Sequence, residues 1–217
     1  MAPLAAGLTG LAWFWFELAP QRAGFEDTDN PALGLQFVAA FPGAWVSAGI
    51  ALAISAIALV ATVIAMRDRL QAARPADAGV VVRTIAVIGL FAAFMLLGQA
   101  VTRLAGGPLL YVRSLDQGWG EAAYLVTQFV GAQLFGVAGV ALLAGWITGV
   151  TVLGLRRDVI PRPLALLAVL PALRLLAIPG FPLLPGTAWF VLIAAIPAAF
   201  LWLLVLGAWQ PPARSSL

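Results

Sequence analysis

Two ionisable residues, Glu17 and Arg174, lie inside apolar stretches of the sequence. A charged side chain is costly inside a membrane, and those found there commonly pair with each other or line a functional cavity. Glu17 and Arg174 could therefore face each other and form an ion pair. Alternatively, Glu17 lies among lipid headgroups and Arg174 extends its long side chain outward to the membrane surface.

Uncharged polar residues lie in two other apolar stretches, in the same half of the predicted bundle. They are Gln99, Thr102, Thr127, Gln128 and Gln133. Together with the two charges and with Trp13 and Trp15, they could line an outward-facing pocket for a small amphipathic ligand. Alternatively, they form interhelical hydrogen bonds that hold a bundle together, worth about 0.6 kcal/mol each. For such a pocket, the predicted ligand-binding residues are Glu17, Gln99, Gln128, Gln133 and Arg174.

The absence of certain residue types excludes several kinds of chemistry. The 217-residue chain has no His and no Cys, and its twelve basic residues are all Arg. Without His or Cys, iron–sulfur clusters, common haem ligation, most zinc sites and a Ser-His-Asp triad are excluded. Without Lys, no Schiff base can form. We therefore expect no enzymatic activity, no cofactor and no metal, and the scattered arginines do not indicate a nucleic-acid partner.

The composition predicts that a membrane positions these residues. The chain is 63% hydrophobic and 10% charged, whereas a soluble protein carries about 25% charged residues. A helix of about 20 apolar residues crosses a bilayer, so we predict an all-α transmembrane bundle of about six spans, forming a single domain over residues 1–217. A short interfacial helix over residues 31–41 should begin at Asn30-Pro31. The predicted spans are residues 4–19, 44–66, 84–102, 122–155, 164–178 and 187–209.

Prolines interrupt this pattern at three of the spans. The first span is predicted to end at Pro20, and Pro171 divides the short segment 164–178, which either spans the membrane or re-enters it. Pro197 lies inside the last span. Interior prolines free backbone carbonyls and occur in the broken helices of transporters, although they also occur as simple kinks.

The arginines near the spans indicate an orientation in the membrane. Cytoplasmic loops carry an excess of Arg and Lys. Alternate loops hold Arg67, Arg69, Arg74, Arg83, Arg156, Arg157, Arg162 and Arg214 on one side, against Arg22, Arg103 and Arg113 on the other. We therefore predict an inner (plasma) membrane protein with both termini in the cytoplasm. Trp45 and Trp189 would then lie at the outer interface, where Trp anchors helices.

Small residues form a row along the predicted span 44–66, at spacings of three and four. They are Ala44, Ala48, Ala51, Ser55, Ala58, Thr62 and Ala65. A second row on the predicted span 122–155 consists of Ala141, Gly145 and Gly149. Small residues allow helices to approach closely in lipid. Each row could lie in the internal core or could dock a partner membrane subunit, and membrane lipid is expected to cover the other faces.

Two segments carry a resemblance to a known group of proteins. They are Phe25–Trp45, FEDTDNPALGLQFVAAFPGAW, and Leu155–Leu170, LRRDVIPRPLALLAVL. The chain resembles small multi-pass membrane proteins of high-GC bacteria that are grouped as domains of unknown function. The resemblance implies a helical membrane bundle and supplies no functional residues.

These observations predict a non-enzymatic multi-pass membrane protein that acts as a binding or accessory subunit without a cofactor. The alternative is a small transporter or lipid-binding permease with an outward-facing polar pocket. A transporter requires a continuous polar path through the membrane. The inner half of the predicted spans offers only hydroxyl groups, such as those of Ser55, Thr62, Thr148 and Thr151.

Overall fold

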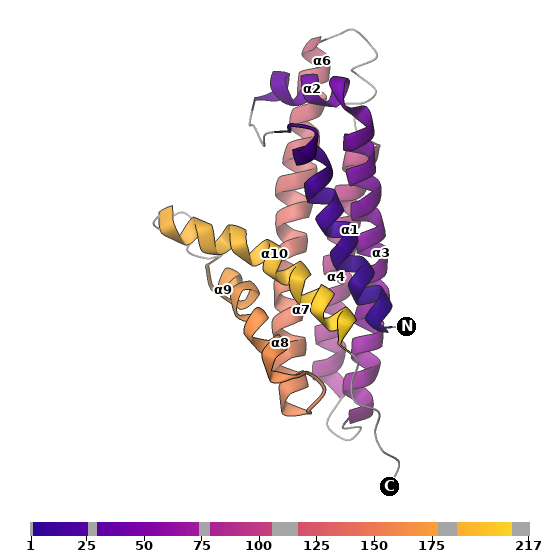
Figure 1. The fold of residues 1–217 in the computed structure, drawn as a ribbon, viewed down its shortest axis with the longest axis vertical. Helices are drawn as coiled ribbons and strands as arrows, with labels where there is room; N and C mark the ends of the chain where they lie inside the picture. The colour runs from indigo at the N-terminus through magenta and orange to yellow at the C-terminus, as the bar shows by residue number, and fades with distance from the viewer. Residues whose placement is uncertain (1, 26–29, 74–78, 106–116, 178–185, 210–217) are drawn as a thin grey trace.

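The computed structural model describes residues 2–25, 30–73, 79–105, 117–177 and 186–209, with side chains for 3–25, 30–73, 79–105, 120–173 and 194–209. This part of the chain is helical and contains no β-strand (Figure 1), which confirms the all-α fold class. The helices are α1 (Ala2–Arg22), α2 (Pro31–Ala40), α3 (Pro42–Ala73), α4 (Gly79–Leu104), α6 (Gln117–Val126), η1 (Thr127–Gly136), α7 (Val137–Arg156), α8 (Arg162–Leu167), α9 (Val169–Ala177) and α10 (Gly186–Ala208).

Three helical stretches within the described residues are long and apolar enough to cross a membrane. They are α3, α4 and the continuous stretch Gly120–Arg156, which combines most of α6 with η1 and α7. They contain the predicted spans 44–66, 84–102 and 122–155. Sequence reasoning succeeds here because long uncharged stretches have no other stable arrangement in a membrane.

The short helix α2 lies across one end of the bundle, beside α6 (Figure 1). It begins where the sequence predicts, because the Asn30 side chain accepts hydrogen bonds from the backbone N–H groups of Ala32 and Leu33, at 3.0 and 3.4 Å. Pro31 occupies the first turn, where its missing N–H costs nothing. A break at Phe41 separates α2 from α3, so the chain forms two helices in this region.

The first helix does not end at Pro20, as the sequence analysis predicted, but continues to Arg22. Its end is set by Gly24, which has a positive φ of 87°. The N–H groups of Gly24 and Phe25 donate to the carbonyls of Gln21 and Pro20, both at 3.0 Å. This is the hydrogen-bond pattern that a glycine in the left-handed conformation forms at a helix C-terminus. Pro20 costs one hydrogen bond in the last turn, which is too little to end the helix there.

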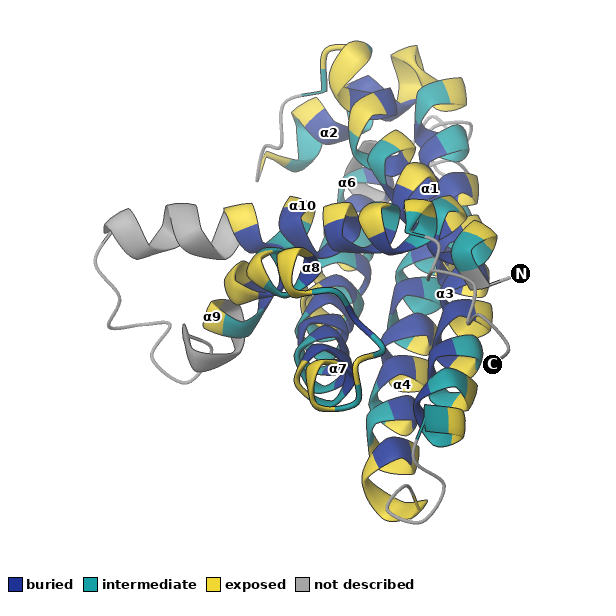
Figure 2. Cartoon of the chain, turned by 60° about the horizontal axis from the view of Figure 1, so that its bottom comes forward, coloured by how far each residue is buried: buried dark blue, intermediate teal, exposed yellow. Residues whose placement is uncertain are grey.

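The small-residue row of α3 faces α1 inside the bundle. Its middle members, Ala48, Ala51, Ser55, Ala58 and Thr62, are buried, and α1 and α3 pack along their length. The opposite face of α3 carries exposed Ile50, Ile54, Ile57, Val60 and Ile64. Figure 2 shows this division between buried inner faces and exposed outer faces around the bundle. The α3 row therefore belongs to the internal core of the chain.

Ser55 links α3 to α1 directly, since its hydroxyl donates to the Thr9 carbonyl at 2.8 Å. We expect Ser55→Ala to lower the free energy of unfolding by about 0.6 kcal/mol, the average value of an interhelical hydrogen bond in a membrane protein. Reversible unfolding in mixed micelles measures this change. Thr84→Ala is the control, because the exposed Thr84 hydroxyl donates to Val80 of its own helix. An equal loss in both variants would contradict the link.

The predicted span 164–178 is divided into two short helices, α8 and α9, that meet at Ala168. Pro171 explains the division, because it has no N–H to donate to the Leu167 carbonyl and its ring clashes with that carbonyl. Residue 178 lies outside the described residues. The last helix, α10, continues through Pro197 and crosses α1 and α7 obliquely (Figure 1).

The α1 and α10 backbones approach closely through glycine. A Cβ atom added to Gly207 would lie 2.5 Å from the Gly7 backbone nitrogen and 2.7 Å from the Pro3 carbonyl oxygen. Further along the same contact, the Trp13 and Phe200 rings stack with centroids 4.0 Å apart. The contact fixes α10 against the inner face of α1, and α1 carries several residues of the site described next.

Candidate functional site

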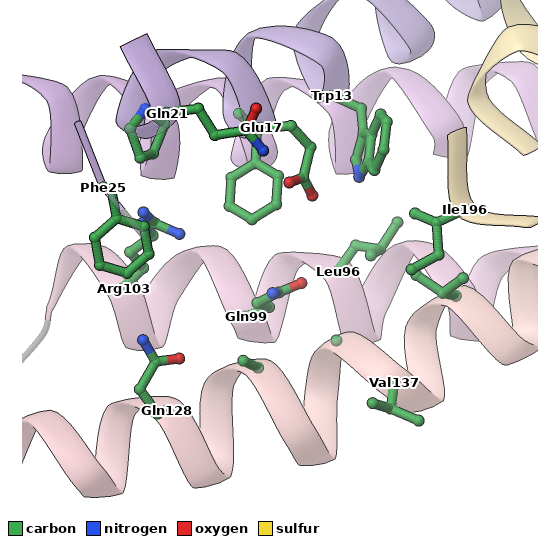
Figure 3. Close-up of a pocket in the computed structure, with 15 residues that line it drawn as sticks. Trp13, Glu17, Gln21, Phe25, Leu96, Gln99, Arg103, Gln128, Val137 and Ile196 are labelled. Carbon is green, nitrogen blue, oxygen red and sulfur yellow. The ribbon is translucent and has the colours of Figure 1, made fainter. Parts of the chain in front are cut away.

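A cavity of about 320 Å³ lies between α1 on one side and α4, η1 and α7 on the other (Figure 3). We call it the inter-helix pocket. Among the described side chains of α10, Ile196 also lines it. The lining residues are Trp13, Phe16, Glu17, Pro20, Gln21, Phe25, Leu96, Gln99, Arg103, Gln128, Ala132, Gly136, Val137, Val140 and Ile196.

The structure brings three of the five predicted binding residues, Glu17, Gln99 and Gln128, to this pocket. They come from three different helices, and their side chains point toward the space between them (Figure 3). Gln133 is exposed and is not part of the lining, because it directly follows Ala132 of the lining row and so points to another face of the helix. The side chain of Arg174, and with it the proposed pair with Glu17, lies outside the described residues.

Arg103 is the charged lining residue that the sequence analysis did not select. Its guanidinium carbon lies 4.0 Å from the centroid of the Trp45 ring and 5.1 Å from that of Phe16. Both distances are within the range of favourable cation–π contacts. The Trp45 indole N–H donates to the Arg103 carbonyl at 3.1 Å, so one tryptophan holds both the backbone and the side chain of Arg103.

The spacing between Arg103 and Gln99 in the sequence indicates that both residues line the same pocket. Arg103 follows Gln99 by four residues, and Gln21 follows Glu17 by four, and residues four apart share one helix face. From the sequence alone, Arg103 is instead predicted to be a loop arginine that ends a span. Phe25 could not be placed from the sequence, because it enters the lining only through the turn at Gly24.

Trp45 is not exposed to its surroundings, as a tryptophan that anchors a helix at a membrane interface would be. Only 1% of the residue is exposed, and it packs in a cluster with Phe37, Val38 and Tyr124 at the α2 end of the bundle. Trp45 therefore contacts Arg103 inside the bundle and does not project into the surroundings as an anchoring tryptophan would. Trp189, the second predicted interface tryptophan, has its side chain outside the described residues.

The middle of the pocket depends on residues in and around η1, a π-helix of ten residues that the sequence analysis did not predict. Such segments are rare and frequently mark functional sites. Gly136 leaves space for Gln99, since a Cβ there would lie 2.9 Å from Gln99 Nε2. At the N-terminal end of η1, Gln128 Nε2 donates to the Tyr124 hydroxyl at 2.9 Å.

The hydroxyls of Thr102 and Thr127 do not link helices through the bonds they donate. Thr102 donates to the Gln99 carbonyl and Thr127 to the Ala123 carbonyl, each at 2.9 Å and each within its own helix or helical stretch. Interhelical bonding by these hydroxyls therefore does not account for the polar cluster. The polar lining of the pocket therefore consists of the glutamine amides and the two charged side chains.

The pocket is polar at one end and apolar at the other (Figure 3). On α4 the lining runs from Arg103 through Gln99 to Leu96, a rise of about 10 Å along the helix. Gln21, Phe25 and Gln128 lie near Arg103, whereas Val137 and Ile196 lie near Leu96. The pocket thus offers a charged end that can bind a polar group and an apolar end that can bind hydrocarbon.

The described side chains do not include a group of three or more His, Cys, Asp or Glu residues that could hold a metal ion. Comparison with protein-family models, with curated proteins and with solved structures finds no match to this chain. The helices of the described chain and their apolar outer faces define it as a helical protein that suits a membrane. What the pocket could bind follows from its own chemistry.

Proposed function

We propose that this chain is a multi-pass membrane protein that binds a small amphipathic ligand in the inter-helix pocket. One observation carries the proposal: Glu17 of α1, Gln99 and Arg103 of α4, and Gln128 of η1 converge on one cavity of about 320 Å³. Ligand sites have volumes of about 300–1,000 Å³ and combine an apolar lining with a few polar groups. Neither catalysis nor a cofactor is part of this function.

In the proposed arrangement α1, α8–α9 and α10 complete a six-span bundle in the inner (plasma) membrane of a bacterium. The 21 residues of α1 extend over about 31 Å, enough for the hydrocarbon core. An apolar exposed stripe along α1 supports this reading: Leu4, Leu8, Leu11, Trp15 and Leu18. Arg157 donates to the Leu70 carbonyl at 2.6 Å, so the arginine-rich ends of α3 and α7 lie together, as a shared cytoplasmic side requires.

Under this orientation α2 lies at the outer surface and the polar end of the pocket opens toward it. An accessory role with a partner subunit would then use the small-residue row of α7. Ala141, Gly145 and Gly149 are only half-buried, whereas the row of α3 is covered by α1. Of the two rows, the α7 row is therefore the one that leaves surface for a partner.

Transport is the second candidate, and one observation favours it. Two irregular helices border the pocket: η1 contributes Gln128, Ala132 and Gly136, and Ile196 of α10 directly precedes Pro197. Broken helices border the sites of many transporters. Against transport, the deeper hydroxyls of Ser55, Thr62 and Thr148 donate to backbone carbonyls and are not pocket-lining residues. Binding is therefore the function that we propose first.

Filling the pocket tests the proposal. We expect Ala132→Phe to reduce the amount of co-purified small molecule about tenfold, the effect of 1.4 kcal/mol, because Ala132 lines the cavity and the ring would occupy it. Native mass spectrometry of protein extracted from its own membrane in mild detergent measures the bound species. The matched control, Leu134→Phe, adds the same ring at an exposed position of η1 and should leave binding unchanged.

Two results would contradict the proposal. Either the native protein carries no discrete ligand, or both phenylalanine variants carry as much ligand as the native protein. A stoichiometric second subunit in the same spectra, without a ligand, would support the accessory role instead. Flux of the ligand into sealed proteoliposomes would support transport.

A further inference from the structure

On the basis of the proposed binding function, we infer that the ligand of the inter-helix pocket is an uncharged lipid. Its hydroxyl-bearing head group lies at the Gln99 amide, and its hydrocarbon chain leaves the pocket past Val137. Three features point to this ligand class: the glutamine amides of the lining, the balance of its formal charges, and the place where its apolar end reaches the surface.

Three glutamine amides supply polar groups that suit an uncharged head group. Gln99 lies in the middle of the pocket, and Gln21 and Gln128 lie at its polar end (Figure 3). A primary amide offers a carbonyl acceptor and N–H donors, and a hydroxyl group both donates and accepts. An amide and a hydroxyl can therefore each satisfy the other without any charge on the ligand.

Gln99 is the amide that is best placed for the head group. Its Nε2 atom packs against η1, since a Cβ on Gly136 would lie 2.9 Å from it. The side chain is half-buried, and its amide forms no hydrogen bond with any residue in the described part of the chain. The Thr102 hydroxyl donates to the backbone carbonyl of Gln99 and so does not occupy the amide. A half-buried amide gains from a hydrogen bond that a ligand supplies.

Gln128 complements Gln99 from the opposite wall. Its Nε2 donates to the Tyr124 hydroxyl at 2.9 Å, which fixes the orientation of the amide. The Gln128 carbonyl oxygen is an acceptor, and a second hydroxyl on the head group could donate to it. A head group with more than one hydroxyl therefore fits the lining better than a simple alcohol.

The formal charges of the described lining cancel. Glu17 of α1 carries a carboxyl group and Arg103 of α4 a guanidinium, and their sum is zero whichever groups each side chain contacts. Transfer of a charged head group from water into surroundings of low dielectric constant is costly unless an opposite charge offsets it. A zwitterion would lose the hydration of two charges. An uncharged head group avoids both costs.

The apolar end of the pocket reaches the outer surface at Val137. Leu96 and Val140, at the same end, are 1% and 7% exposed, whereas Val137 is 46% exposed although it lines the same cavity. Leu134, three residues earlier, is also exposed. In the proposed bundle, lipid covers this outer face. A hydrocarbon chain that leaves past Val137 would enter the bilayer, which favours a lipid over a soluble alcohol.

Titration of the delipidated full-length protein with probes that share an oleoyl chain tests the head group. Monooleoylglycerol is uncharged and carries hydroxyls, methyl oleate lacks the hydroxyls, oleoyl lysophosphatidylglycerol adds an anionic phosphate, and oleoyl lysophosphatidylethanolamine is a zwitterion. Glycerol lacks the chain. Native mass spectrometry gives the apparent Kd of the first bound molecule. We expect monooleoylglycerol to bind about tenfold more tightly than each of the other probes, because it alone combines the chain with uncharged hydroxyls.

Gln99→Met assigns the head-group preference to the pocket. Methionine has nearly the shape of glutamine but lacks the amide, so monooleoylglycerol should bind about tenfold more weakly and methyl oleate should be unaffected. The variant should therefore lose the preference between these two probes. Gln133→Met is the matched control, since it makes the same change at an exposed residue outside the lining, and it should retain the preference.

Val137→Phe tests the path of the chain. The larger side chain would narrow the apolar end, so monooleoylglycerol and methyl oleate should both bind about tenfold more weakly. Val152→Phe is the matched control, because Val152 lies on the same helix, is 48% exposed and is not a lining residue. It should change neither affinity.

Equal affinity for monooleoylglycerol and methyl oleate, or an unchanged preference in Gln99→Met, would overturn the inference. Tighter binding of either lysophospholipid would show a charged head group, tight binding of glycerol would show a soluble ligand, and unchanged affinities in Val137→Phe would contradict the path of the chain. Ala132→Phe separates these failures from failure of the proposed function. If it abolishes binding while Gln99→Met has no effect, the pocket binds a ligand of another class. If it also has no effect, the pocket is not the binding site.

Discussion

Truncation of Trp45 to alanine is expected to lower the free energy of unfolding by about 3–5 kcal/mol, the usual cost of removing a buried large aromatic side chain. Trp45 is 1% exposed and joins four helices. Its ring contacts the Arg103 guanidinium of α4 at 4.0 Å and lies 6.2 Å from the Tyr124 ring of α6. It also packs against Phe37 of α2.

The control for this change is Trp15→Ala, which removes the same side chain from the outer face of α1, where Trp15 is 49% exposed. We expect its cost to stay below about 1 kcal/mol, as for surface substitutions. Trp45→Phe should fall between the two, since it keeps a ring over Arg103 but loses the N–H that donates to the Arg103 carbonyl at 3.1 Å. Unfolding in mixed micelles measures all three, and equal losses in Trp45→Ala and Trp15→Ala would contradict the structure.

Gly207→Ala is the second substitution with a large expected effect, although it adds a single methyl group. The added Cβ would lie 2.5 Å from the Gly7 nitrogen and 2.7 Å from the Pro3 carbonyl oxygen. Both are backbone atoms, so no side chain can rotate away, and α1 and α10 must separate. We expect a loss of about 1–3 kcal/mol, the usual cost of overpacking, measured as the shift in the unfolding transition in detergent.

Gly7→Ala tests the same contact from the other helix. A Cβ at Gly7 has no neighbour within 4 Å, and alanine favours a helix over glycine by about 1 kcal/mol. Gly7→Ala should therefore be neutral or stabilising, although Gly7 itself contacts Gly207. If Gly207→Ala were also neutral, α1 and α10 would not approach as closely as described.

The sequence predicts the long apolar helices and the start of α2 because each depends on local information. A stretch of uncharged residues sets α3 and α4, and the pair Asn30-Pro31 sets the first turn of α2. The ends that depend on three-dimensional context are predicted less well. The end of α1 is such a case, because the turn at Gly24 and not Pro20 ends the helix. The division between α8 and α9, by contrast, follows from Pro171, as predicted.

The site shows a similar limit. Glu17, Gln99 and Gln128 could be selected because polar residues are conspicuous in apolar helices. Arg103 was set aside because an arginine at a helix end usually lies at the membrane surface, and only its neighbours Trp45 and Phe16 reveal that it turns inward. Gln133 could not be separated from Gln128 without knowing which face of the helix turns toward α1.

Because η1 is a π-helix, the pocket wall that it forms is sensitive to rotation about the helix axis. Its last hydrogen bonds still span five residues, as the Val137 N–H donates to the Ala132 carbonyl, so η1 contains more residues per turn than the α-helix on either side. Each α-helical residue turns the chain by about 100°, and each π-helical residue turns it by less. Relaxation of η1 into an α-helix would therefore rotate α6 relative to α7. Such a rotation would carry Gln128 and Tyr124 away from Arg103. The contact of Tyr124 with Gly34 of α2 opposes this rotation. Helix α2 therefore holds one wall of the pocket in its observed rotation, although α2 does not itself line the pocket.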